Sequence, residues 1–137
     1  MRIMAVDYGD ARTGVAISDL LCSLVGTTTV IHSRNTEKTL QELQRLVKEN
    51  DVGEIAVGLP KNMDGTEGAR AQLCREFAER LEELTGLSVK LWDERRTTVE
   101  AHNILSAHNY HGKKRKNTVD AVAASLILEG YLAFRNH

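Results

Sequence analysis

The sequence predicts an α/β domain of three layers, in which helices cover both faces of a mixed five-stranded sheet. Two apolar runs near the N-terminus are separated by only a short turn, and so short a connection favours an antiparallel hairpin. Farther along, apolar runs alternate with segments whose apolar residues recur every three or four positions. Strand, helix and strand in succession form the crossover that parallel pairing needs, so the later strands are expected to be parallel.

The first three strands are expected to be antiparallel neighbours. Ile3–Val6 is an apolar run without alternation, which suits a strand buried on both faces. A turn over Tyr8–Arg12 leads into a second strand at Thr13–Ser18. The third strand is expected within Leu24–His32, because β-branched residues crowd the middle of that segment.

The pattern then changes to the helical period. Asn35 or Thr36 can cap a helix that leads to a fourth strand at Glu54–Leu59. The apolar face of this helix consists of Leu40, Leu43, Leu46 and Val47.

A polar loop over Pro60–Gly68 follows the fourth strand, and a second helix is expected to open at Thr66 or Glu67. Gly86 suits the left-handed position that ends a helix, and Ser88–Trp92 is the expected fifth strand. The apolar face of the second helix is expected to consist of Leu73, Phe77, Leu81 and Leu84.

Two further helices complete the predicted order. Thr97 and Glu100 have the spacing of a capping box, so a helix is expected to begin there. His108–Asn117 is polar and basic and reads as a loop, and the last helix is expected over Thr118–Phe134. Its expected apolar face is Val119, Val122, Ala123, Leu126 and Ile127.

Length and composition restrict the class of protein. The chain has 137 residues, which suits a single domain over residues 1–137, and its 42% apolar and 27% charged residues indicate a globular fold. The net charge of -1 means that any nucleic-acid-binding surface must be local. Cys22 and Cys74 lack a metal-type pairing and read as reduced thiols of a cytoplasmic protein. Neither a secretory signal pattern nor a membrane span is predicted.

Three carboxylates stand at comparable structural places. Asp7 ends the first strand, Glu94 follows the fifth strand with Asp93 beside it, and Asp120 lies in the first turn of the expected last helix. Clustered carboxylates without a histidine or cysteine pattern favour a hard cation, Mg²⁺ or Mn²⁺. Such ions align the attacking and leaving oxygens of a phosphodiester displacement. Asp7, Glu94 and Asp120 are therefore the predicted metal ligands and catalytic residues.

Each acid also has a purely structural interpretation. Asp7 can cap its turn, and Glu94 can pair with Arg95 or Arg96 on the surface. Asp93 is more readily explained as a turn or helix-entry residue than as a ligand. Asp120 can complement the dipole of a helix that begins near Asn117.

Basic residues are expected to surround the acids. The run Lys113, Lys114, Arg115 and Lys116 would by itself be a solvated loop, but it directly precedes Asp120. Arg12, Arg95 and Arg96 can join it at the same rim. Lysine and arginine contacts to phosphates give affinity without sequence choice, so these residues are candidates for nucleic-acid binding.

With these residues identified, the chain resembles the YqgF/RuvX family of the RNase H-like superfamily. The resemblance covers essentially the whole chain in the family's order. It rests on Val6-Asp7-Tyr8-Gly9, Arg12-Thr13-Gly14-Val15-Ala16, Val57-Gly58-Leu59-Pro60, Asn62-Met63-Asp64-Gly65-Thr66, Asp93-Glu94-Arg95, Thr97-Thr98 and Asp120-Ala121.

The resemblance implies an RNase H-like fold and a metal-dependent nuclease. The family is described both as a Holliday junction resolvase and as a nuclease of the 5′ processing of pre-16S ribosomal RNA. By this similarity Asp7, Glu94 and Asp120 correspond to an acidic triad, and Asp93 lies next to its second position. The segment Gly58–Thr66 matches a family signature whose physical role the sequence does not explain.

The sequence leaves several functions open. The first is a nuclease for a structured rRNA precursor, with a resolvase of branched DNA as its variant; a four-way junction would suit a weak homodimer. The spacing of Asp7, Gly9 and Gly14 also resembles the first phosphate loop of actin-like kinases, but the chain has no room for their second domain. The third is a non-catalytic nucleic-acid-binding module that uses the basic residues alone.

Overall fold

The computed structural model describes residues 1–96 and 112–136, and for residues 96 and 112–120 it describes the backbone alone. The elements are β1 (Arg2–Asp7), β2 (Arg12–Ser18), β3 (Val25–His32), α1 (Thr36–Glu49), β4 (Val52–Leu59), α2 (Ala69–Thr85), β5 (Ser88–Asp93), the 3₁₀ turn η1 (Glu94–Arg96) and α4 (Gly112–Arg135). All five predicted strands are present. The helix predicted to begin at Thr97 lies outside the described residues.

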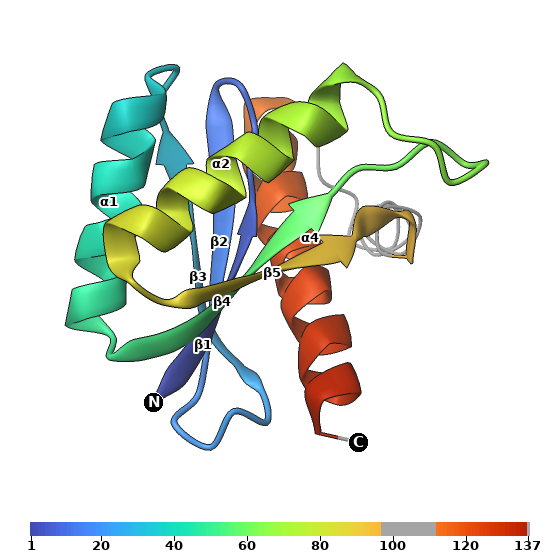
Figure 1. Cartoon of the computed structure of the whole chain (residues 1–137). Coiled ribbons are helices and arrows are strands. Elements are labelled where there is room, and N and C mark those ends of the chain that lie inside the picture. The colour runs from blue at the N-terminus through green and yellow to red at the C-terminus, as the bar shows by residue number, and fades with distance from the viewer. Residues whose placement is uncertain (97–111, 137) are drawn as a thin grey trace.

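The sheet is mixed, as the sequence predicts. Its strand order is β3-β2-β1-β4-β5, with β1 at the centre (Figure 1). β2 pairs antiparallel with both β1 and β3, whereas β4 pairs parallel with β1 and β5. The carboxyl ends of β1, β4 and β5 therefore meet at one edge of the sheet, which is where ligands bind in folds of this kind.

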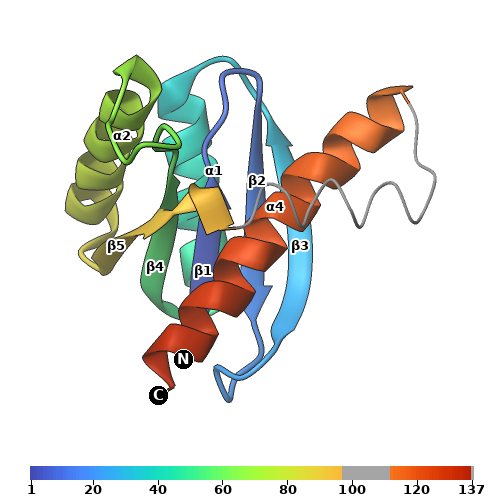
Figure 2. The same ribbon diagram turned by 90° about the vertical axis from the view of Figure 1, so that its right-hand side faces the viewer.

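Helices cover both faces of the sheet, with α1 and α2 on one side and α4 on the other (Figures 1 and 2). The core on the α1–α2 side includes Val6, Leu43, Ile55 and Leu81. The core under α4 includes Ile3, Ala5, Ala16, Ala56, Ile127 and Leu128. Small residues on this face of the strands allow α4 to pack close to the sheet. No helix among residues 1–96 and 112–136 combines the length and the apolar composition needed to cross a membrane.

Helix α1 begins where its cap predicts. The Asn35 side chain accepts a hydrogen bond from the backbone N–H of Lys38 at 3.1 Å, which satisfies a donor of the first turn. Leu40, Leu43 and Val47 are buried against the sheet. The predicted cap is therefore confirmed, and so is the apolar face, of which Leu46 is only partly buried.

Helix α2 begins later than the sequence predicts, at Ala69 rather than at Thr66 or Glu67. Thr66 belongs to the preceding loop, because its backbone N–H donates to the Asp64 carboxylate at 3.0 Å. Phe77 and Leu81 are buried as predicted, but Leu73 and Leu84 are largely exposed, so the predicted apolar face was too wide.

Helix α4 begins earlier than predicted, at Gly112 rather than near Thr118. Lysine and arginine are good helix formers, so the predicted basic loop continues the helix toward its N-terminus. Asp120 consequently lies in the third turn and not in the first. The buried face is also shifted, since it consists of Ala124, Ile127, Leu128, Tyr131 and Leu132, whereas Val122, Ala123 and Leu126 are only partly buried.

Candidate active site

Asp7 lies at the carboxyl end of the central strand, between two glycines of the neighbouring strands. It pairs with Gly14 of β2, and Gly58 of β4 follows Val57, which pairs with Val6. Because side chains alternate along a strand, Asp7 points to the same face as Ile3 and Ala5, under α4. The two glycines leave room for other groups to approach its carboxyl group.

Glu94 fills part of that room. It is the first residue of η1, immediately after β5, and its carboxyl group shares a hydrogen bond with that of Asp7. The Glu94 side chain lies across Gly58, where an added Cβ would be 2.6 Å from Oε1 and 2.7 Å from Cδ. Only glycine at position 58 therefore permits this position of Glu94 beside Asp7.

The surroundings of Asp7 disfavour its ionised form. Burial raises the pKa of Asp7 well above its ordinary value, and the hydrogen bond and negative charge of Glu94 raise it further. Arg70 acts in the opposite direction and lowers the pKa of Asp7. Two adjacent carboxyl groups cannot both ionise at low cost, so this pair favours a cation, either a proton or a metal ion, at the same place.

Arg70, in the first turn of α2, braces the turn that follows Asp7. Its guanidinium donates to the backbone carbonyl of Tyr8, pairs with Asp10 at 2.8 Å and lies 5.2 Å from the centre of the Tyr8 ring. The Tyr8 ring stacks in turn on Phe77 at 3.9 Å between centroids. Arg70 therefore places a fixed positive charge near the carboxyl pair.

The turn itself depends on Gly9. An added Cβ at this position would lie 2.1 Å from the backbone oxygen of Arg12, so any side chain would push the hairpin open. This close contact brings Arg12, at the start of β2, to the same rim as Asp7.

Asp93 is committed to a different partner. Its carboxylate pairs with Arg95 at 2.6 Å and accepts the backbone N–H of Arg95 at 3.0 Å. These interactions with Arg95 hold the pKa of Asp93 below its ordinary value. Neighbouring side chains of a strand point to opposite faces, and Trp92 packs under α4, on the face to which Asp7 points. The Asp93 side chain therefore faces away from Asp7. The structure thus brings Glu94, and not Asp93, to Asp7.

The remaining predicted site residues lie outside what the structure describes at side-chain level. The backbone of Asp120 belongs to α4, which covers the face of the sheet where Asp7 lies. Only the backbone is likewise described for Arg96, Lys113, Lys114, Arg115 and Lys116. Among the residues with described side chains, no third Asp, Glu, His or Cys joins Asp7 and Glu94.

A thiol also lies close to the carboxyl pair. Cys74 of α2 is buried with Leu59 and Ala71, and burial raises the pKa of its thiol to about 11. At neutral pH this thiol remains protonated, so it acts as an apolar packing group rather than as a nucleophile or ligand.

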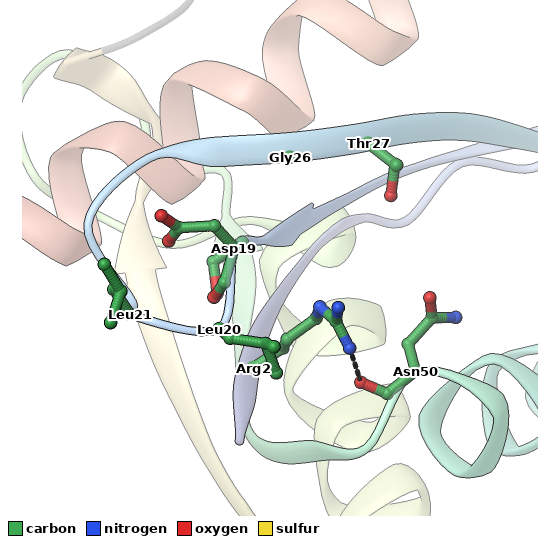
Figure 3. A pocket seen from close by; sticks show the side chains of 8 residues that line it. Arg2, Asp19, Leu20, Leu21, Gly26, Thr27 and Asn50 are labelled. Carbon is green, nitrogen blue, oxygen red and sulfur yellow. Dashed lines mark hydrogen bonds between the residues drawn. The ribbon is translucent and has the colours of Figure 1, made fainter.

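A pocket of about 490 Å³ lies at the opposite end of the sheet, between the start of β1 and the β2–β3 loop (Figure 3). Its charged groups serve the local structure. Arg2 donates to the backbone oxygen of Asn50 at 2.9 Å, and Asp19 accepts the backbone N–H groups of Ser23 and Leu24. This pocket therefore lacks the paired carboxyl groups that mark the rim at Asp7.

The sequence gives Gly58 no physical role beyond its place in a family signature, and it does not single out Arg70. The position of Gly58 is indicative, because a glycine within an apolar strand often marks a place where another group approaches closely. Arg70 gives no such indication, since an arginine in the first turn of a helix is ordinary and its contacts with Tyr8 and Asp10 appear only in the folded chain.

Comparison with known sequences identifies relatives over nearly the full chain. A family described as "RuvX: Holliday junction resolvase" matches residues 1–134. A protein of Halothermothrix orenii named "Putative pre-16S rRNA nuclease" is 47% identical over 136 residues, which cover 99% of this chain and 97% of the relative. A protein of Carboxydothermus hydrogenoformans with the same name is 40% identical over 136 residues, which cover 99% of both chains.

Solved structures share the fold at low sequence identity. RuvC of Thermus thermophilus in complex with a Holliday junction substrate superposes with a TM-score of 0.65 at 11% identity, over 99% of this chain and 96% of that chain. The fowlpox virus resolvase in complex with Holliday junction DNA gives 0.59 at 10% identity, over 100% of both chains. These likenesses confirm the predicted fold, which is that of RuvC-type resolvases.

Proposed function

We propose that this protein, which belongs to the RuvX family, is a nuclease that hydrolyses phosphodiester bonds of structured nucleic acid at the rim where Asp7 and Glu94 meet. The observation that carries the proposal is the contact between these two carboxyl groups, which glycine at position 58 makes possible. A pair of acids in hydrogen-bond contact is costly to bury, and carboxyl groups perturbed in this way cluster at functional sites.

The donor set of this rim fits a divalent cation. Asp7 and Glu94 offer only carboxylate oxygens, which suit the hard ions Mg²⁺ and Mn²⁺. We propose that Asp120 of α4 supplies a third carboxylate, because α4 covers the same face of the sheet. When bound, such an ion activates water and stabilises the charge that develops on the phosphate.

The chain's own groups prepare this rim. Burial and the proximity of Glu94 raise the pKa of Asp7, so a positive charge beside the two carboxyl groups would stabilise their ionised form. Arg70 fixes the turn after Asp7 through Tyr8 and thereby holds the carboxyl group in place. We propose that the basic residues Arg12, Arg95, Arg96, Lys113, Lys114, Arg115 and Lys116 contact the phosphates of the substrate around the rim.

The two relatives are named as pre-16S rRNA nucleases. We propose the 5′ processing of pre-16S rRNA in the cytoplasm as the cellular reaction of this protein. The family description favours a second candidate, resolution of Holliday junctions, for which two symmetric cuts would require a weak homodimer. A non-catalytic binding module is a third possibility, and it predicts binding that survives the loss of the acids.

The experiment compares a precursor 16S rRNA fragment with a synthetic four-way DNA junction, each incubated with Mg²⁺ or Mn²⁺. Wild-type protein is expected to cleave the rRNA fragment, and Asp7→Asn is expected to abolish cleavage. Asp51→Asn is the matched control, because Asp51 is an exposed acid at the opposite end of the sheet and its left-handed backbone suits asparagine.

The outcomes separate the candidates. Preferential cleavage of the junction would identify a resolvase instead of an rRNA nuclease. Binding without cleavage, unchanged by Asp7→Asn, would identify a binding module. Cleavage by Asp7→Asn at the wild-type rate would refute the assignment of the site.

A further inference from the structure

The loop Pro60–Gly68, hereafter the 60–68 loop, is held in one shape by its own hydrogen bonds. The backbone N–H of Asn62 donates to the Thr66 oxygen at 2.8 Å, and that of Gly65 donates to the Asn62 oxygen at 2.8 Å. The Thr66 hydroxyl also bonds to the Asp64 carboxylate at 2.6 Å. The loop therefore presents its outermost residues in a fixed arrangement although it projects from the sheet (Figure 1).

The same loop is attached to the segment that carries Glu94. Arg95, the next residue, donates to the backbone oxygen of Met63 at 3.5 Å while it pairs with Asp93 at 2.6 Å. At its other end the loop follows β4 two residues after Gly58, over which the Glu94 side chain lies. Met63 thus has a defined position relative to the carboxyl pair.

Met63 is the unusual residue of this exposed loop, because it is a large apolar residue and is 88% exposed. Two cations, one in the loop and one next to it, are already paired, because Lys61 lies 4.0 Å from Glu67 and Arg75 pairs with the same carboxylate at 2.6 Å. What the loop offers to a ligand is an apolar, polarizable side chain on a rigid support whose charges are largely balanced.

We propose that Met63 packs against an unstacked base of the substrate and so contributes to substrate binding beside Asp7 and Glu94; this inference rests on the proposed nuclease function. Methionine adapts its shape to flat or irregular apolar partners. Proteins that deform nucleic acids insert apolar side chains, methionine among them, between base steps. A structured substrate with a loop or branch offers such a base at low cost.

The test uses three variants in the cleavage assay. Met63→Ala is expected to raise KM about tenfold with little change in kcat, because a buried apolar contact of this size is worth about that factor. Met63→Leu keeps the apolar volume and is expected to restore KM. Leu21→Ser is the matched control, because Leu21 is 84% exposed in a loop at the opposite end of the sheet.

A second measurement reports the base contact without catalysis. In an Asp7→Asn background, substrates carrying 2-aminopurine at successive positions around the cut are expected to show a fluorescence increase on binding at one position. Met63→Ala is expected to remove this increase while the dependence of binding on salt concentration stays unchanged, because no phosphate contact is lost.

An unchanged fluorescence increase in Met63→Ala would overturn the proposal, as would an equal loss of binding in Leu21→Ser. A weaker salt dependence in Met63→Ala would also overturn it, since the residue would then act through phosphate contacts. Failure of the wild-type protein to cleave would refute the proposed function, and the fluorescence measurement would still decide on the contact of Met63.

Discussion

Replacing Gly58 by alanine tests whether the contact between Glu94 and Asp7 governs activity. Gly58 lies in the buried part of β4, and its backbone conformation is open to other residues, because it is absent from the residues with positive φ. The strand can therefore accept alanine. The three atoms nearest to the new methyl group, Oε1, Cδ and Cγ, all belong to the Glu94 side chain.

The size of the effect follows from the contact distances. The methyl carbon would lie 2.6 Å from Oε1, whereas ordinary contacts begin at 3.4 Å, so the Glu94 carboxyl group must withdraw by about 0.8 Å. A misplacement of about 1 Å in a catalytic group costs about 100-fold in rate. Stability is expected to change little, because alanine restricts the unfolded chain more than glycine does and this gain offsets part of the local strain.

The assay is single-turnover cleavage of the precursor rRNA fragment, with thermal unfolding measured on the same preparation. Gly68→Ala is the matched control, since a Cβ at position 68 meets no atom within 4 Å. We expect Gly58→Ala to lose about 100-fold in rate at a nearly unchanged melting temperature. A folded Gly58→Ala protein that cleaves at the wild-type rate would refute the role assigned to Gly58 and to the position of Glu94.

Two further predictions concern the charge of Asp7. Asp7→Asn should raise the melting temperature of the metal-free protein at neutral pH, because it removes a buried carboxyl group beside Glu94. The folded-state pKa of Asp7 lies above its unfolded value. The stability that Asp7 contributes is therefore present below about pH 4 and is lost as the pH rises through the folded-state pKa. Urea unfolding should show this trend in the wild-type protein and not in Asp7→Asn. Arg70→Gln should raise the pKa of Asp7 further and move the acidic limb of the pH–rate profile to higher pH, whereas Arg75→Gln, an exposed control, should leave it in place. An unmoved acidic limb in Arg70→Gln would contradict this electrostatic role.

The strands were predictable because local signals and burial agree along them. Ile3–Val6 is apolar throughout and occupies the centre of the sheet, where both faces are covered. The starts of α2 and α4 were not predictable from the same signals. At Thr66 a bond to Asp64 holds the chain in a turn, and before Asp120 the basic residues extend the helix instead of ending it.

The acids of the site were predictable where they stand at the end of a strand. They were less predictable where their role depends on which side chains the neighbouring strands bring together. Asp7 and Glu94 could be proposed from position alone, and the structure brings them into contact. The reason for choosing Glu94 over Asp93 is not local, because it depends on the alternation of β5 and on the ion pair with Arg95. Asp120 stays a prediction, since its side chain lies outside the described residues.

The most direct test of the central claim is a double-mutant cycle on single-turnover cleavage with Asp7→Asn, Glu94→Gln and the combined variant. If the two carboxyl groups act as one site, each single variant should lose at least about 100-fold in rate, and the combined variant should be no slower than the slower single variant. Losses that multiply in the combined variant, or a Glu94→Gln protein that cleaves like wild type, would contradict the account.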